Sequence, residues 1–70
     1  MSAEKLQQLR AYWLANVPLD TRVQLAPRYA ILYVMCTIGD DAVAEQTLAN
    51  MDLSPDQEEH REAMLAIMRA

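Results

Sequence analysis

The most informative stretch of the sequence is Tyr29-Ala30-Ile31-Leu32-Tyr33-Val34-Met35-Cys36-Thr37-Ile38. Its apolar side chains follow no period, so a helix here would be apolar around its whole circumference and buried on every side. A buried strand is the alternative, because the run is short and rich in residues that favour strands. We favour the helix, since a single strand in this chain could pair only with a copy of itself.

The chain around this stretch is short, at 70 residues and 8.0 kDa, which allows a single domain, 1–70. A chain of this size buries only about 60% of its unfolded surface, and its one cysteine cannot form an internal disulfide. Domains of this kind rely on close helix packing or on association between subunits.

Three short flanking helices can hardly cover every face of residues 29–38. We therefore expect a homodimer with this helix at or near the two-fold axis, where the same patch of both subunits meets. The alternative is a compact monomer in which the hydroxyls of Tyr29 and Tyr33 reach solvent. The expected dimer contacts are Tyr29, Leu32, Tyr33, Met35 and Cys36.

Turn-forming and capping residues predict an all-α bundle of four short helices over approximately 2–16, 20–38, 40–50 and 55–70, with the second helix central. Ser2 and Asp40 can accept hydrogen bonds from the first turns of the first and third helices. The sequence Ser54-Pro55-Asp56-Gln57 matches a capping box with proline at the first helical position.

The second helix is less clearly marked. Asp20 or Thr21 is expected to cap its start, and Gly39 to end it in the left-handed conformation. Pro27 falls inside this span, so the helix is either kinked there or begins at Pro27 after a short turn.

Apolar residues at three- and four-residue spacing predict which faces of the other helices point inward. The predicted inward residues are Leu6, Leu9, Trp13 and Val17 in the first helix, Val43, Ala44, Thr47, Leu48 and Met51 in the third, and Met64, Ile67 and Met68 in the fourth.

Charge is divided along the chain, whose net charge is −4. Residues 1–39 hold four basic and two acidic side chains, whereas residues 40–70 hold two basic and eight acidic ones. Nucleic acids and anionic membranes are therefore not expected as partners. The acidic half would suit a basic protein surface, although carboxylates also gather at helix N-termini for local reasons. The candidate steering residues are Asp40, Asp41, Glu58, Glu59 and Glu62.

The chain offers little that could perform catalysis or hold a cofactor. Cys36 lies in the most apolar segment, where burial makes a thiol inert. His60 and Asp56 share a helix face but supply only two ligands, an incomplete metal site. No glycine-rich phosphate loop is present. We therefore expect no enzyme activity, no cofactor and no metal.

Two clusters are candidates for contact with another protein. Tyr12 and Trp13 belong to residue types enriched at binding hot spots. The face formed by Met64, Leu65 and Met68 is the other candidate, because methionine adapts to varied partners; core filling is the alternative role.

The stretch Gly39-Asp40-Asp41-Ala42-Val43-Ala44-Glu45-Gln46-Thr47-Leu48-Ala49-Asn50-Met51-Asp52-Leu53-Ser54-Pro55 resembles the second helix of a tetratricopeptide repeat. There, a Gly-Asp turn is followed by an alanine-bearing helix and a Leu-x-Leu-x-Pro ending. The resemblance implies that the second to fourth helices stack as antiparallel hairpins.

Taken together, these features predict a small, acidic, cytoplasmic, non-catalytic module that binds another protein and inhibits or modulates it. Proteins that phages and mobile elements encode against host machinery share this general character. The alternative is a structural subunit or adaptor of a larger assembly, in which residues 29–38 meet a foreign helix. A helix-turn-helix regulator over 31–50 is less favoured, because the basic charge that DNA binding needs is missing.

Overall fold

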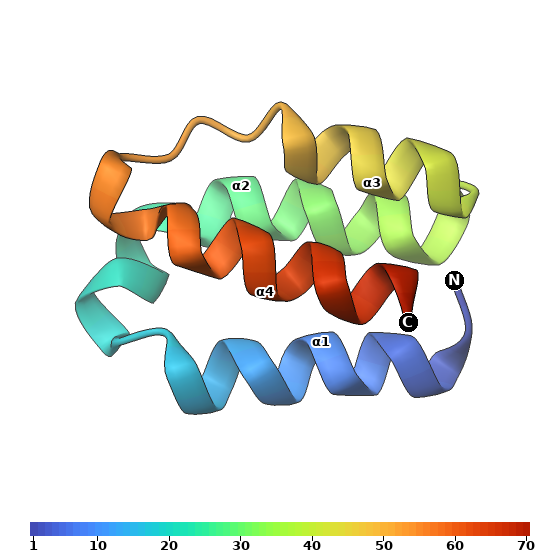
Figure 1. Ribbon diagram of the computed structural model, residues 1–70, viewed down its shortest axis with the longest axis horizontal. Coiled ribbons are helices and arrows are strands. Elements are labelled where there is room, and N and C mark those ends of the chain that lie inside the picture. The colour runs from blue at the N-terminus through green and yellow to red at the C-terminus, as the bar shows by residue number, and fades with distance from the viewer.

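A computed structural model describes residues 1–70 and contains four α-helices and one short 3-10 helix (Figure 1). Each predicted helix is present, and the predicted all-α bundle is confirmed. The bounds differ from the predicted ones by one residue at most, apart from the first turn of the last helix, which is 3-10. The elements are α1 (Ala3–Asn16), α2 (Leu19–Ile38), α3 (Asp41–Ala49), η1 (Pro55–Gln57) and α4 (Glu58–Arg69).

The four helices occupy the corners of a square in cross-section. Successive helices run in opposite directions, and both chain ends lie at the same end of the bundle (Figure 1). Helix α1 packs on α2 and α4, and α3 packs on the same two neighbours. Helices α2 and α4 are therefore at diagonal corners, and their outer faces point away from each other. The antiparallel stacking of α2, α3 and α4 agrees with the predicted hairpins.

Three predicted caps fix where helices begin. Ser2 Oγ accepts from the backbone N–H of Lys5 at 3.2 Å, and Asp40 Oδ1 accepts from that of Val43 at 2.8 Å. The N–H of Ser54 donates to Gln57 Oε1 at 3.1 Å, as the predicted capping box requires. Each cap satisfies a donor that the helix start would otherwise leave unpaired.

The start of α2 corrects the predicted cap. The helix begins at Leu19 directly after Pro18, so Asp20 and Thr21 lie inside its first turn. Helix α2 continues through Pro27 without a break, and its first turns (teal) run in a different direction from the rest (Figure 1). Pro27 and Val23 are both exposed. Water can therefore satisfy the Val23 carbonyl that the proline leaves without its helical donor.

Gly39 ends α2 but does not adopt the predicted left-handed conformation. Its φ is −91° and its ψ is 174°, an extended conformation open to other residues. Glycine is required here by space, because a Cβ would lie 2.8 Å from the carbonyl oxygen of Met35. The tight approach sets the angle at which the chain leaves α2 and enters α3.

The core lies between the four helices and draws on all of them. The predicted inward faces are confirmed for most positions, with Leu6, Thr47 and Ile67 half-buried; Val43 is wrong, since it is exposed. The buried apolar residues are Leu9, Trp13 and Val17 near or in α1, Leu25, Leu32 and Cys36 in α2, Ala44, Leu48 and Met51 in or after α3, and Met64, Leu65 and Met68 in α4.

Candidate functional site

The outer face of α2 is apolar and exposed. Helix α2 has two helix neighbours like the others and is not central as predicted, so its own chain leaves one of its faces uncovered. Ile38 is 76% exposed and Ile31 57% exposed. We call this surface the outer α2 stripe, defined by Ala26, Pro27, Ala30, Ile31, Val34 and Ile38, all of which are exposed.

A groove runs beside the stripe, between α1 and α2, and encloses about 450 Å³. Three aromatic rings lie between the two helices: Trp13 stacks on Tyr29 with ring centroids 4.0 Å apart, and Tyr29 lies 6.4 Å from Tyr33. Rings of this size hold the helix axes apart. The groove is lined by Arg10, Trp13, Leu14, Tyr29, Ala30, Tyr33 and Val34.

The hydroxyl of Tyr29 is buried in this region and has no hydrogen-bond partner. Burial raises the pKa of Tyr29, with smaller contributions from Tyr33 and Cys36, while Arg10 lowers it. The monomer alternative expected the hydroxyls of Tyr29 and Tyr33 to reach solvent. For Tyr29 that expectation is wrong, because its hydroxyl is buried. An unpaired buried hydroxyl costs about 1–3 kcal/mol of folding free energy. The fold tolerates this cost at Tyr29, which lines the groove.

The predicted dimer contacts fall on different sides of α2. Leu32 and Cys36 are wrong as surface contacts, because both are buried in the core of their own chain at 1% exposure. Tyr29 and Met35 are half-buried, and Tyr33 is exposed. Burial also raises the pKa of the Cys36 thiol, as predicted for an inert cysteine.

The methionine face of α4 is also corrected as a partner surface. Met64 and Met68 are buried against the other helices, and Leu65 is buried beside them. These side chains fill the core, the alternative role, because α4 has no other apolar face with which to close the bundle.

Tyr12 and Trp13 have their main contacts inside the chain. Trp13 is buried under Tyr29. The Tyr12 hydroxyl lies 2.9 Å from His60 Nδ1 and links α1 to α4. Burial raises the pKa of Tyr12, and the nearby charge of Glu59 adds to the effect. His60 is buried in this contact.

The carboxylates of residues 40–62 are mostly engaged locally. Asp40 caps α3, Asp41 Oδ1 lies 3.5 Å from the amino group of Met1, and Glu58 pairs with Arg61 at 3.3 Å. Glu59 and Glu62 are different, since both are exposed on α4 and neither forms an ion pair. Only this pair of the predicted steering residues is free to meet a partner.

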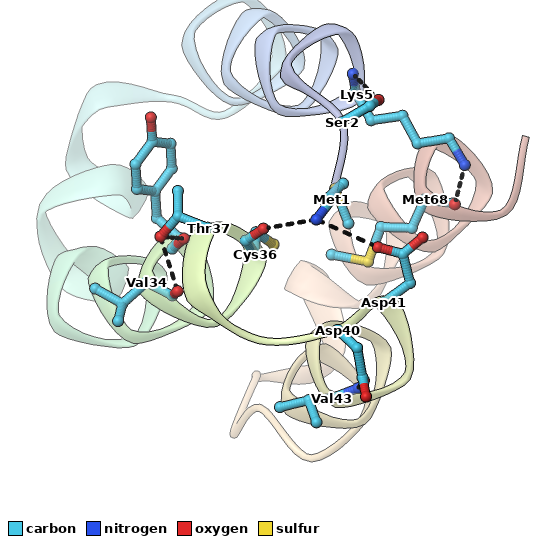
Figure 2. A network of polar contacts seen from close by, with 11 residues as sticks. Met1, Ser2, Lys5, Val34, Cys36, Thr37, Asp40, Asp41, Val43 and Met68 are labelled. Carbon is cyan, nitrogen blue, oxygen red and sulfur yellow. Dashed lines mark hydrogen bonds and ion pairs between the residues drawn. The ribbon is translucent and has the colours of Figure 1, made fainter.

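A polar network closes the end of the bundle that holds both chain ends (Figure 2). The amino group of Met1 donates to the carbonyl oxygen of Cys36 at 3.1 Å, close to Asp41. Lys5 Nζ donates to the carbonyl oxygen of Met68 at 2.7 Å. These contacts tie the start of the chain to α2, α3 and α4 and satisfy carbonyls at two helix ends.

No cluster of three or more His, Cys, Asp or Glu side chains is positioned to hold a metal ion. None of the helices has the length and apolar character needed to cross a membrane. No protein-family model, curated protein or solved structure matches the chain.

Ile31, Val34 and Ile38 are not among the predicted site residues, although they belong to the apolar stretch 29–38. Their spacing of three and four residues places them on one face. This spacing alone does not predict that they are exposed, because equally apolar residues surround them on α2. The prediction also needs to know which face of α2 points inward.

Proposed function

We propose that the protein is a non-catalytic, homodimeric binding module that attaches to a basic surface of another protein and modulates its activity. The observation that supports this most directly is the separation of two surfaces. The outer α2 stripe is apolar and without charge, whereas the unpaired carboxylates Glu59 and Glu62 lie on α4, at the diagonal corner of the bundle.

This arrangement gives each surface its own role. Association through the α2 side removes the apolar stripe from water, which is favourable in proportion to the area buried. It leaves the α4 side of each subunit free. Carboxylates there would meet lysine and arginine side chains of a partner and speed the encounter at low salt.

The test is retention of partner proteins from a lysate of the encoding organism on immobilised chain. The variant Glu59→Gln/Glu62→Gln should lose the retained protein, whereas the control Glu4→Gln/Asp20→Asn, which removes the same charge from α1 and α2, should keep it. The recovered protein should then change in activity when the unmodified chain is added. Equal retention by both variants would contradict the proposed role of α4.

A structural subunit of a larger assembly is the second candidate, and the exposed outer α2 stripe favours it. In that case a helix of a foreign protein covers the stripe. Sedimentation of the purified chain separates the two functions, since a soluble dimer supports the binding module. An aggregating or molten monomer supports the subunit.

A further inference from the structure

We infer that two copies pack through their outer α2 stripes, antiparallel about a two-fold axis, with Ala30 of each copy opposite Val34 of the other. The inference rests on the proposed homodimer and specifies its contact. Three features of the stripe carry it: its taper, its spacing and its lack of charge.

Between Ala26 and Ile38 the stripe tapers along the chain, and the larger exposed residues Leu19 and Val23 lie before it. Its first half has the small side chains Ala26, Pro27 and Ala30, and its second half has larger ones, ending at Val34 and Ile38. A parallel pairing would place large side chains against large ones and leave a gap at the small end. An antiparallel pairing sets small against large along the whole contact, which gives the even packing that helix interfaces need.

The spacing fits the same arrangement. Pro27, Ala30, Val34 and Thr37 follow one another at intervals of three and four residues, the pattern of a helix that packs lengthwise on another helix. In an antiparallel pair centred beside residue 32, Ala30 lies opposite Val34 and Pro27 opposite Thr37.

Thr37, the one polar residue on this path, does not oppose burial. Its hydroxyl oxygen lies 2.8 Å from the carbonyl oxygen of Val34 and 3.2 Å from that of Tyr33, so its proton is donated within its own helix. Packing it against a second copy leaves no hydroxyl donor unpaired, and its methyl group adds apolar contact.

Charge does not oppose self-association either. The stripe contains no charged residue. Arg28, the charged residue nearest its centre on α2, lies 3.8 Å from Asp52, in the segment between α3 and η1. The stripe residues themselves therefore bring no unpaired charge into the contact, the main cost of a poorly matched interface, and the one charged residue of the neighbouring groove is Arg10, which is exposed.

A dimer must cover a sizeable share of the surface of each chain. A stable interface takes about 800 Å² from each partner, roughly a fifth of the 4299 Å² exposed by this chain. Ala30 and Val34 line both the stripe and the groove beside α1, so a second copy also covers the open side of the groove. Leu14 and Tyr33 extend the apolar contact on that side.

Sedimentation of the unmodified chain and two valine variants tests the contact. Val34 is 45% exposed and Val43, on α3, is 42% exposed, so the two positions are matched. Val34→Asp should raise the dimer dissociation constant by more than about 100-fold, because each dimer would bury two charges. Val43→Asp should leave it within about threefold. Far-UV circular dichroism checks that both variants stay helical.

Cysteine pairs test the direction. Ala30→Cys/Val34→Cys should form a covalent dimer on mild oxidation, because these positions face each other across the axis. Each single variant should not, since the two copies of one position lie about four residues, or 6 Å, apart along the axis in addition to their lateral separation. The unmodified chain, whose only cysteine is buried, gives the blank.

The outcomes are distinct. A monomer at all concentrations overturns both the proposed dimer and this contact, and a foreign helix would then be the occupant of the stripe. A dimer that survives Val34→Asp and fails to cross-link overturns the contact alone. Cross-linking of both single variants shows a parallel pair and overturns the antiparallel arrangement.

Discussion

Helices α2 and α4 lie at diagonal corners of the same bundle and have opposite designs. Helix α4 is apolar on one side only: Met64 and Met68 are buried, while Glu59, Glu62 and Arg69 are exposed. Helix α2 buries Leu25, Leu32 and Cys36 on one side and exposes the outer α2 stripe on the other.

The contrast shows that the fold buries, wholly or in part, every large apolar residue of α4 but fewer than half of those of α2. Burying one face of α2 is enough to close the bundle. The second apolar face stabilises nothing within the chain, so its chemistry points to a contact outside it. Four substitutions can break or sharpen this comparison, in order of expected effect.

The largest effect separates two neighbouring residues of α2. Leu32→Ala should lower the free energy of unfolding by about 2–5 kcal/mol, since Leu32 is fully buried. Ile31→Ala, on the outer stripe, should change it by less than about 0.5 kcal/mol in dilute protein. Urea titration followed by circular dichroism measures both. Equal losses would mean that α2 does not have two different faces.

Gly39→Ala tests whether the turn after α2 fixes which face points inward. The added Cβ would meet the backbone oxygen of Met35 at 2.8 Å, and a backbone atom cannot move aside as a side chain can. We expect a loss of about 1–3 kcal/mol in the free energy of unfolding. A neutral result would show that the entry into α3 is loosely held.

The sequence predicts the bundle well because its helix boundaries depend on local chemistry. Ser2, Asp40 and the Ser54–Gln57 box act within one turn, so their effect can be read without knowing the fold. The start of α2 directly after Pro18 was harder to predict, because a proline can end one helix and directly precede the next. The candidate site was only partly predictable.

The division of α2 into two faces depends on where α1 and α3 pack, which no residue within 29–38 reveals. Leu32 and Ile31 have the same character in sequence and opposite places in the structure. For the methionines of α4 the prediction is wrong in the opposite sense, because residues expected at a partner surface lie in the core. Methionine side chains are adaptable and fit both places. The predicted steering carboxylates differ from one another for a local reason, because several of them cap helices or form ion pairs at helix ends.

Tyr12→Phe tests the side-chain contact between α1 and α4 at His60. It removes the hydroxyl that lies 2.9 Å from His60 Nδ1 and should cost about 0.5–1.5 kcal/mol. Tyr33→Phe, on the exposed side of α2, is the control and should cost almost nothing. Thermal unfolding of the two variants gives the comparison directly. A larger loss from the control would place the tyrosine contribution on α2.

The smallest effect at neutral pH is expected from Tyr29→Phe, which removes a buried hydroxyl that has no partner. The variant should be as stable as the unmodified chain or slightly more stable.

Its larger effect should appear at alkaline pH. Burial raises the pKa of Tyr29 above its usual value of 10.0, so the folded state holds the proton more tightly than the unfolded state. The stability from this difference is fully present below pH 10 and is lost as pH rises through the folded-state pKa. Tyr29→Phe should therefore lose less stability than the unmodified chain between pH 9 and pH 11, measured by urea titration. Parallel losses would show that other groups dominate, among them Tyr12 and Cys36, whose pKa values burial also raises.

The contact between Lys5 and the Met68 carbonyl has a consequence for chain connectivity. It holds the first and last helices together at one end of the bundle, where both termini lie (Figure 1). A short glycine-rich linker could join the ends, and the chain could be opened instead at Asp52, an exposed position between α3 and η1. Every helix would keep its two neighbours in such a circular permutant. Such a permutant would keep the faces that meet in the bundle and lose the contacts that the charged Met1 amino group makes with Cys36 and Asp41.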